Sequence, residues 1–279
     1  MKCGKNDREI AAQDNKEAVA EFWNHASCGE ELYLKGDECE HYASQAKARY
    51  VLEPYIAGFA EFAAQRGKRV LEIGVGLGAD HQQFAQAGAM LHGCDLTSRA
   101  VEHTRRRLQL FGLRSELRQA DAENLPYPDE SFDFVYSWGV LHHSPDTPKA
   151  IAEVHRVLKP GGEARIMVYH KYSFVGYMLW LRYAFLRGKW TTSLESIYAD
   201  HLESPGTKAY SIEGGRKLFA QFRSVSIETV LTHGDLLSSG AGQRHRGALL
   251  TVARGLWPRR AIRRLFPRHG LFMLIWAGK

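Results

Sequence analysis

Short apolar runs alternate with longer amphipathic stretches through the middle of the chain. The runs are rich in β-branched and aromatic residues, whereas the stretches between them repeat apolar side chains with the spacing of a helical face. Such alternation is typical of βαβ units, which build a parallel sheet with helices on both faces. The pattern predicts strands at residues 69–73, 90–94, 115–119, 132–137 and 164–169.

The pattern changes on both sides of this middle part. Before it, residues 1–67 repeat apolar positions at helical spacing around a polar break, so we expect an N-terminal helical cap. After it, residues 171–221 are rich in aromatic side chains and interrupt the alternation. We expect this segment to be an insertion that covers one end of the sheet as a lid over the site of the ligand that is acted on, the acceptor. We therefore expect one α/β domain at residues 68–279 behind the helical cap. Its remaining parts are predicted strands at 225–231 and 271–277 and a basic connection at 232–269.

The composition fits a globular chain in a reducing compartment. With 279 residues and 44% hydrophobic content, the chain can bury the core of one large domain. It has no apolar run as long as a membrane span and opens on a polar stretch, so we expect no signal peptide and a cytoplasmic location. The cysteines are too sparse for a disulfide scaffold and are expected to be reduced: Cys3, Cys28, Cys39 and Cys94. His25 and His41 lie near Cys28 and Cys39, which leaves a metal or thiophilic-ligand site as an alternative, but we expect no metal.

The net charge of +6 is concentrated near the C-terminus. No Asp or Glu occurs from Leu236 to Lys279, where the basic residues are Arg244, Arg246, Arg254, Arg259, Arg260, Arg263, Arg264, Arg268 and Lys279. The simplest interpretation is a solvated basic face. Because apolar residues are interleaved with the charges, the alternative is that this region contacts an anionic membrane surface or a phosphorylated acceptor. The arginines meant are Arg259, Arg260, Arg263 and Arg264. No RNA-binding appendage is recognisable, so nucleic acid is not an expected partner, and the sequence does not indicate the oligomeric state.

Residues with ligand-binding character begin where the first predicted strand ends. The apolar run 69–73 stops at Gly74, Gly76 and Gly78, and a helix-forming stretch begins at Ala79. This order suits a nucleotide site, because glycines let the backbone approach a ligand and the helix directs free N–H groups towards it. The same residues satisfy the dinucleotide fingerprint, and Asp95 lies where a ribose-binding acid falls in that motif. The glycine turn alone therefore leaves an NAD-dependent enzyme open.

Three later segments separate these alternatives. They are Asp121-Ala122-Glu123-Asn124-Leu125-Pro126, Ser137-Trp138-Gly139-Val140-Leu141-His142-His143 and Arg156-Val157-Leu158-Lys159-Pro160-Gly161-Gly162. Together with the strand Val70-Leu71-Glu72-Ile73, its glycine turn and Asp95, they resemble in order the motifs of class I S-adenosylmethionine-dependent methyltransferases. The likeness is to the methyltransferase-11 type, and within it to the branch that includes the ubiquinone and menaquinone C-methyltransferases. It covers residues 68–170 and does not extend to the flanks.

The resemblance implies a fold and a cofactor. The fold is α/β, with a Rossmann-like, seven-stranded, mostly parallel sheet, helices on both faces and an antiparallel last strand. The cofactor is S-adenosyl-L-methionine, and S-adenosyl-L-homocysteine is the product. Glu72 would face the methionine amino group, Asp95 would accept hydrogen bonds from the ribose and Asp121 would accept one from the adenine amine. The cofactor-binding residues implied in this way are Glu72, Gly74, Gly76, Gly78, Asp95, Leu96, Asp121, Ala122, Glu123, Trp138 and His142.

The acceptor side is less defined. His142 and His143 follow the fourth predicted strand, where such folds expose residues to the ligand crevice. One of them is a candidate general base, since histidine titrates near neutral pH; the alternative is that they line the donor pocket. Tyr169 ends the fifth strand and is the third candidate catalytic residue. The aromatic residues of 172–190 favour an apolar or aromatic acceptor, or else pack the core of the lid itself.

Three functions follow from these alternatives. The leading one is methyl transfer from S-adenosylmethionine by in-line displacement to a small-molecule acceptor with a C, O, N or S nucleophile. The second is a membrane-peripheral lipid or quinone methyltransferase, or an RNA methyltransferase, that uses the basic C-terminal region. The third is a protein of the same fold with non-methylating chemistry.

Overall fold

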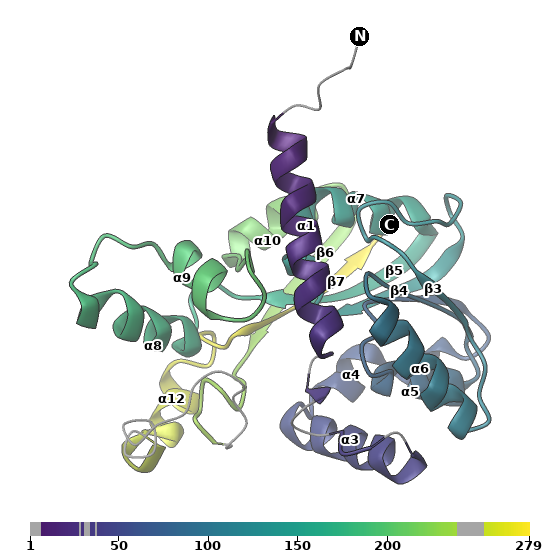
Figure 1. Cartoon of the computed structure of the whole chain (residues 1–279), viewed down its shortest axis with the longest axis horizontal. Helices are drawn as coiled ribbons and strands as arrows, with labels where there is room; N and C mark the ends of the chain where they lie inside the picture. Colours follow the sequence, from purple (N-terminus) through teal and green to yellow (C-terminus); the bar gives the residue numbers. More distant parts are fainter. Residues whose placement is uncertain (1–6, 28, 31–33, 37, 239–253) are drawn as a thin grey trace.

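The centre of the molecule is an open seven-stranded sheet in the order β3-β2-β1-β4-β5-β7-β6 (Figure 1). The computed structural model describes residues 7–27, 29–30, 34–36, 38–238 and 254–279, with the backbone alone for residues 7–14. The strands are β1 Arg69–Ile73, β2 Met90–Asp95, β3 Glu116–Gln119, β4 Phe132–Trp138, β5 Leu158–Tyr169, β6 Ser224–Val230 and β7 Phe272–Gly278. Strand β7 runs antiparallel to both β5 and β6, and all other pairings are parallel. The mostly parallel sheet that the resemblance implied is therefore confirmed.

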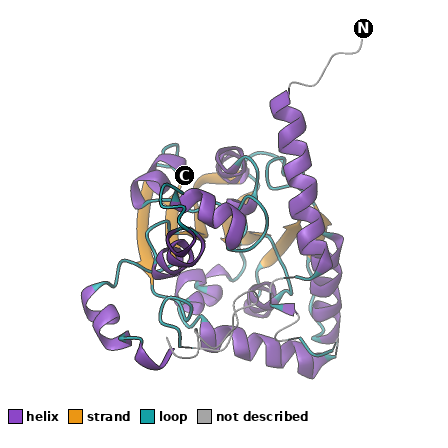
Figure 2. Cartoon of the chain, turned by 60° about the vertical axis from the view of Figure 1, so that its left-hand side comes forward, coloured by secondary structure: helices purple, strands orange, loops and turns teal. Residues whose placement is uncertain are grey.

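Helices cover both faces of this sheet (Figure 2). The α-helices are α1 Asp7–His25, α3 Cys39–Leu52, α4 Ile56–Ala60, α5 Ala79–Ala87, α6 Ser98–Leu110, α7 Thr147–Val157, α8 Phe174–Tyr183, α9 Leu194–His201, α10 Ile212–Leu218 and α12 Arg259–Leu265. The 3₁₀ helices are η1 Phe62–Gln65, η2 Leu141–His143 and η3 Phe185–Arg187. No helix in the described part of the chain combines the length and the apolar content needed to cross a membrane.

Alternate side chains of each strand supply two separate hydrophobic cores. On β5, Ile166 packs in the core that includes α7, whereas its neighbour Met167 packs in the core that includes α4 and α5. Successive strand residues point to opposite faces, so a strand buried on both sides needs apolar residues at nearly every position. This requirement explains why β1 and β4 are mainly apolar, although Glu72 interrupts the first and Asp133 and Ser137 the second.

Local caps explain where the central helices begin. Helix α6 begins after Thr97, whose side chain accepts a hydrogen bond from the Ala100 amide. Helix α7 begins after Asp146, which caps it in the same way, and Pro148 occupies its first turn. Helix α5 ends at Gly88, which adopts the left-handed conformation.

Strand β5 begins earlier than the sequence predicts. Helix α7 ends at Val157 and β5 starts directly at Leu158, so the segment 159–162, expected as a connection, lies inside the strand. The expectation was wrong because this segment has a partner far away in the chain. The Gly161 amide donates to the Lys279 carbonyl, and the Lys279 amide donates to the Gly162 carbonyl. The register with β4 shifts at this point, and the left-handed Gly161 accommodates the irregularity.

The segments outside the middle part are mainly helical. The described part of residues 1–67 contains α1, α3, α4 and η1, and residues 171–221 contain α8, η3, α9 and α10. The two C-terminal strands, β6 and β7, differ from their predicted bounds by one residue. Within the basic connection, residues 239–253, with Arg244 and Arg246, lie outside the described residues, as does Cys28; Cys39 is exposed and Cys94 is buried, both as free thiols.

One buried guanidinium joins the N-terminal helices to the central domain. Arg107 of α6 is fully buried and donates to side-chain oxygens of Gln82 at 2.7 Å and Gln45 at 2.8 Å. It also donates to the backbone carbonyls of Leu77 at 2.9 Å and Tyr42 at 2.8 Å. Four separate parts of the chain, α3, the glycine turn, α5 and α6, therefore share one donor group.

Replacement of Arg107 with Ala is expected to lower the free energy of unfolding by roughly 3–5 kcal/mol, because buried carbonyl and amide oxygens lose their donors. Arg107→Lys should recover only part of the loss, since an ammonium group cannot reproduce the planar fork. Urea denaturation measures the change. Arg105→Ala, on the exposed side of the same helix, is the matched control and should stay within about 0.5 kcal/mol of the parent chain. Equal losses for Arg105→Ala and Arg107→Ala would contradict this account.

Candidate active site

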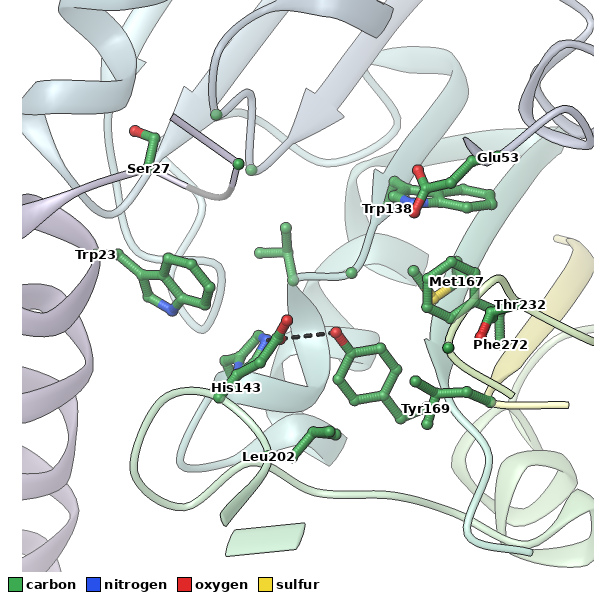
Figure 3. A pocket seen from close by; sticks show the side chains of 18 of the residues that line it. Trp23, Ser27, Glu53, Trp138, His143, Met167, Tyr169, Leu202, Thr232 and Phe272 are labelled. Carbon is green, nitrogen blue, oxygen red and sulfur yellow. Dashed lines mark hydrogen bonds and ion pairs between the residues drawn. The ribbon is translucent and has the colours of Figure 1, made fainter. Parts of the chain in front are cut away.

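A cavity of about 960 Å³ opens where the parallel strands end (Figure 3). The last residue of each of four strands lines it: Ile73 of β1, Asp95 of β2, Trp138 of β4 and Tyr169 of β5. Side chains from α1, α3 and α8 complete the wall. The carboxyl edge of a parallel sheet is the usual ligand position in open α/β folds, because the connections there diverge and leave a crevice.

The glycine turn forms one wall of the cavity. Gly74 and Gly78 have φ angles of 83° and 74°, which disfavour any residue with a Cβ. A Cβ at Gly74 would also stand 2.1 Å from Val140 Cγ2, and one at Gly78 would stand 2.8 Å from Thr104 Oγ1. Gly76 differs, because no atom lies within 4 Å of the place of its Cβ. The turn is thus packed tightly on the protein side and open at Gly76.

Asp95 connects the end of β2 to the glycine turn. Its carboxylate accepts hydrogen bonds from the Thr97 amide at 3.0 Å, the Thr97 hydroxyl at 2.8 Å and the Gly76 amide at 3.2 Å. Burial raises the pKa of this carboxyl, although the three donors oppose that effect. Asp95 and the adjoining Leu96 both line the cavity. The carboxylate is therefore held in a fixed orientation at the cavity wall.

Lys16 of α1 bridges two acids of the Asp121–Glu123 segment. Its ammonium lies 2.6 Å from Asp121 Oδ2 and 2.7 Å from Glu123 Oε2. Asp121 and Ala122 line the cavity, whereas Glu123 does not. Glu123 instead accepts from the Ser144 hydroxyl and the Asp146 amide. Glu123 thus holds the loop before α7, and Asp121 is the acid of this segment that a ligand can reach.

Glu72 belongs to a chain of hydrogen bonds beneath the glycine turn. Its Oε2 lies 2.8 Å from His81 Nδ1, and His81 Nε2 lies 2.8 Å from Ser115 Oγ, which donates to the Leu91 carbonyl. Because Ser115 has one hydroxyl proton and gives it to Leu91, it accepts from His81, so Nε2 carries a proton. One further proton is then shared between His81 Nδ1 and Glu72.

Burial decides where that shared proton resides. Both groups are buried, which raises the pKa of Glu72 well above its usual value and lowers the pKa of His81 to about 3. The proton therefore stays on the Glu72 carboxyl, and both side chains are neutral while no cation is nearby. His81 is positioned to take this proton, since only 2.8 Å separate the two atoms.

A second acid, Asp80, is fully enclosed by donors. Arg49 of α3 contacts it through two nitrogens, at 2.7 Å and 3.2 Å, and the hydroxyls of Tyr50 and Tyr136 donate to it at 2.9 Å and 3.0 Å. Arg49 also lies 3.2 Å from Glu53. Asp80 therefore fixes Arg49 at the cavity wall, and Arg49 in turn fixes the position of Glu53.

Glu53 lies beside Trp138 at the cavity wall (Figure 3). Burial raises the pKa of Glu53 to about 7, although Arg49 opposes the shift. This carboxyl therefore changes its charge near neutral pH. Neither the helical pattern around Glu53 nor a motif distinguishes it in the sequence.

A histidine, a glutamate and a tyrosine meet on the opposite side of the cavity. The Tyr169 hydroxyl donates to Glu203 Oε2 at 2.7 Å, and His143 Nε2 lies 3.4 Å from the same oxygen (Figure 3). His143 Nδ1 is 2.7 Å from the Ser204 hydroxyl, which sets the direction of the ring. All three line the cavity, and 28% of the Glu203 side chain is exposed. Glu203 is thus an accessible carboxylate that accepts a hydrogen bond from Tyr169 and lies beside the His143 ring.

His142 occupies a different position from His143. It is fully buried, is not among the residues that line the cavity, and packs its ring 4.0 Å from that of Tyr169. Burial lowers its pKa well below the usual value, so the ring is neutral. In the described part of the chain, three side chains could supply ligands to a metal ion: His142, His143 and Glu203. One nitrogen or oxygen atom of each lies within 4.8 Å of those of the other two.

The structure brings most of the sequence-predicted site residues to one cavity. Those that line it are Glu72, Gly74, Gly76, Gly78, Asp95, Leu96, Asp121, Ala122, Trp138, His143 and Tyr169. Glu123 and His142 are the two that do not. Sequence reasoning did not select Lys16, Glu53 or Glu203, which come from the cap and the inserted segment. Of these, only Glu203 could have been found from the sequence, because it is an acidic residue within the segment 171–221 that was expected to cover the acceptor.

Residues 71–166 match the model of the methyltransferase domain family. The chain is 40% identical over 116 residues to a fatty-acid O-methyltransferase of Mycolicibacterium smegmatis, covering 41% of each. It is 34% identical over 125 residues to a demethylmenaquinone methyltransferase of Tropheryma whipplei, covering 43% of this chain and 51% of that one. The first relatives thus match over only about a quarter to half of their own length.

Among solved structures, the fold is similar to that of phosphoethanolamine N-methyltransferase 2 of Haemonchus contortus, which was solved with phosphomonomethylethanolamine and S-adenosylhomocysteine. The TM-score is 0.60 at 18% identity, covering 94% of this chain and 60% of that one. A YcgJ protein of Bacillus subtilis has a TM-score of 0.51 at 20% identity, covering 81% of this chain and 98% of that one. At these identities the likeness concerns the fold alone. The family match, the strand order and the ordered motifs thus agree on a methyltransferase domain at residues 71–166.

Proposed function

We propose that this chain transfers the methyl group of S-adenosylmethionine to an apolar small-molecule acceptor and releases S-adenosylhomocysteine. The observation that carries the proposal is a single cavity lined both by the motif residues and by apolar side chains from outside the motifs. The second group comprises Trp23, Val175, Met178, Leu202 and Phe272. A cavity of about 960 Å³ lies at the upper end of the range for small-molecule sites, which leaves room for a donor and an acceptor together.

The donor site suits the chemistry of S-adenosylmethionine. Gly76 lines the cavity with free space where a Cβ would stand, so a ligand can lie against the backbone. The Asp95 carboxylate is held in place by three donors and accepts hydrogen bonds from ribose hydroxyls, and Asp121 accepts one from the adenine amine. Glu72 serves the methionine ammonium. A cation beside Glu72 favours its carboxylate form, and the shared proton then moves to His81 Nδ1.

The bound donor supplies a methyl group on a positively charged sulfur. The nucleophile of the acceptor forms a bond to that carbon as the carbon–sulfur bond breaks, and the electron pair of that bond stays on sulfur. Trp138 and Glu53 offer an aromatic face and a carboxylate to the cation, which stabilises it in the cavity. The contribution of these residues is positioning and charge.

Glu203 accepts the proton that the acceptor loses. Its carboxylate lines the cavity, the Tyr169 hydroxyl fixes its orientation, and the His143 ring lies beside it. A carboxylate in this position acts as a general base towards a hydroxyl, carboxyl or activated carbon acid. His143 supports Glu203, and His142 packs the ring of Tyr169 from behind. The inserted residues 171–221 therefore act as an acceptor lid that also supplies the base.

The apolar lining favours a hydrophobic acceptor. The named relatives act on fatty acids, phosphoethanolamine and demethylmenaquinone, so the family by itself leaves the acceptor open. In this chain, Val175, Met178 and Leu202 of the lid region face the cavity together with Trp23 of α1. Apolar walls exclude water from the reacting atoms and bind apolar groups through burial.

S-Adenosylhomocysteine should bind the purified chain in titration calorimetry, and NAD should not. Asp95→Asn is expected to weaken the binding of S-adenosylhomocysteine by about 10- to 100-fold, because hydrogen bonds from the ribose then go to a neutral acceptor. Glu102→Gln, which removes an exposed acid of α6, is the control and should leave the affinity unchanged. Binding of NAD without binding of S-adenosylhomocysteine would refute the proposed function.

The affinity for S-adenosylmethionine should rise by up to about tenfold between pH 6 and pH 8. Glu53, with a pKa of about 7 in the free protein, is mostly protonated at pH 6 and must lose its proton before its carboxylate can stabilise the positively charged sulfur of the donor. Glu53→Gln should flatten this dependence, as measured by calorimetry in buffers of different ionisation enthalpy. A Glu53→Gln profile as steep as that of the parent chain would assign the effect to another group.

Methyl-labelled S-adenosylmethionine, incubated with the chain and an organic-solvent extract of the source cells, should give a labelled extractable product. Glu203→Gln is expected to lower the rate of label transfer by about 10²- to 10⁴-fold, because the amide cannot accept the proton. The affinity for S-adenosylhomocysteine should stay within about twofold. Glu195→Gln, which changes an exposed acid of α9, is the control and should transfer label at the parent rate. Parent rates from Glu203→Gln would exclude Glu203 as the base.

A further inference from the structure

Two segments next to the cavity share an unusual composition. Residues 177–190 span most of α8 and all of η3, and residues 254–268 contain α12. Together they include nine Arg and Lys residues and no Asp or Glu. Neither segment belongs to the motifs of the methyltransferase domain. We call the surface that they form the α8/α12 face.

The two segments lie side by side although they are far apart in the sequence (Figure 1). Phe174 of α8 packs edge to face against Trp257 at 6.1 Å and against Phe266 at 6.0 Å, measured between ring centroids. The Tyr177 hydroxyl lies 3.2 Å from His269 Nδ1. These contacts join α8 to the second segment and to His269 directly after it, so the two segments form one surface.

Large hydrophobic side chains are exposed on this face. In the described part of the chain, eight of the eleven exposed large hydrophobic residues belong to it: Tyr177, Leu181, Phe185, Leu186, Trp190, Leu256, Leu265 and Phe266. Trp190 is 68% exposed and Leu256 is 81% exposed. Such a concentration on one face of a protein marks a binding surface, because scattered exposed residues are the ordinary case.

The arginines of α12 have two distinct roles. Arg259 points inward and donates to the backbone carbonyls of Leu236, Leu237 and Arg254, while Ile262 is buried. Arg260, Arg263 and Arg264 are exposed. Nothing in the sequence distinguishes the four arginines of this helix. In the structure, Arg259 anchors the helix and the other three face outward.

We propose that the α8/α12 face docks on an anionic lipid bilayer. Arginines and lysines complement the charge of anionic headgroups, and the Trp, Phe and Leu side chains between them enter the boundary between headgroups and acyl chains. Single-stranded nucleic acid would use the charges and the rings, but it offers the exposed leucines no apolar phase. A bilayer offers anionic headgroups to the basic side chains and an apolar phase to the aromatic and leucine side chains.

The docked face adjoins the cavity. Leu181, Leu186, Arg254 and Trp257 belong to the α8/α12 face and also line the cavity wall. A bilayer held against this face would therefore meet the rim of the cavity. The docking itself requires no methyl transfer, so its test is independent of the proposed function.

Co-sedimentation with vesicles tests the proposal directly. The full chain should bind phosphatidylcholine vesicles that contain phosphatidylglycerol, bind pure phosphatidylcholine vesicles much more weakly, and lose binding as salt increases. The triple variant Arg260→Gln/Arg263→Gln/Arg264→Gln should bind about 100-fold more weakly, at roughly fivefold for each charge. The variant Trp190→Ser/Leu256→Ser/Leu265→Ser should also bind more weakly, with its salt dependence preserved.

The matched control removes the same charge elsewhere. Arg105→Gln/Arg106→Gln/Arg114→Gln changes three exposed arginines at α6 and just beyond it, distant from the α8/α12 face (Figure 1), and should bind as the parent chain does. Thermal unfolding confirms that each variant is folded. Equal loss of binding in the two arginine triples would overturn the proposal, as would absence of binding to anionic vesicles at low salt. Tighter binding to a single-stranded RNA probe that is insensitive to the Trp190 triple would assign the face to nucleic acid instead.

Discussion

The buried guanidinium of Arg107 is the interaction on which the rest of the site depends. It holds the Leu77 carbonyl of the glycine turn and, through Tyr42 and Gln45, the helix α3 that precedes the methyltransferase domain. All its partners are neutral oxygens, so its charge is not cancelled, and burial lowers its pKa only to about 10. The group therefore stays charged at neutral pH. Its position fixes α3, and α3 carries the arginine that holds Asp80.

The acids near this cation divide into two classes. Asp80 and Asp95 are surrounded by donors, and their carboxylates act as fixed parts of the scaffold. Glu72 and Glu53 have few donors, and burial raises the pKa of each. Burial thus shifts both carboxyl groups towards the neutral form, and a cation beside them would favour the charged form.

Much of the sheet could be predicted, as could the donor wall, which is the part of the cavity lined by the glycine turn and Asp95, because both are set by local rules. Strands buried on two faces must be mainly apolar, and the turn at Gly74 and Gly78 requires left-handed backbone, so both leave a direct mark on the sequence. The start of β5 could not be predicted in this way, because Gly161 and Gly162 pair with Lys279 at a distance of more than a hundred residues. Pairing of that kind depends on the finished fold.

The acceptor side of the site was harder to predict for the same reason. Glu203 follows a short helix with no motif around it, and it meets Tyr169 and His143 only after the inserted segment has packed. Lys16 reaches Asp121 from a helix that precedes the domain by dozens of residues. His142 and His143 are adjacent in the sequence, but His143 lines the cavity and His142 lies behind it. Sequence position did not distinguish them, whereas packing did.

The placement of β7 has a consequence for how the chain assembles during synthesis. In the described part of the chain, β6 pairs with β7 alone, and β7 fills the space between β5 and β6. A growing chain therefore makes the lid helices, β6 and α12 before the strand that attaches them to the sheet exists. The donor wall can form early from local βαβ units, while the acceptor wall waits for residues 272–278. The acceptor half of the site is thus completed only when this last strand enters the sheet between β5 and β6.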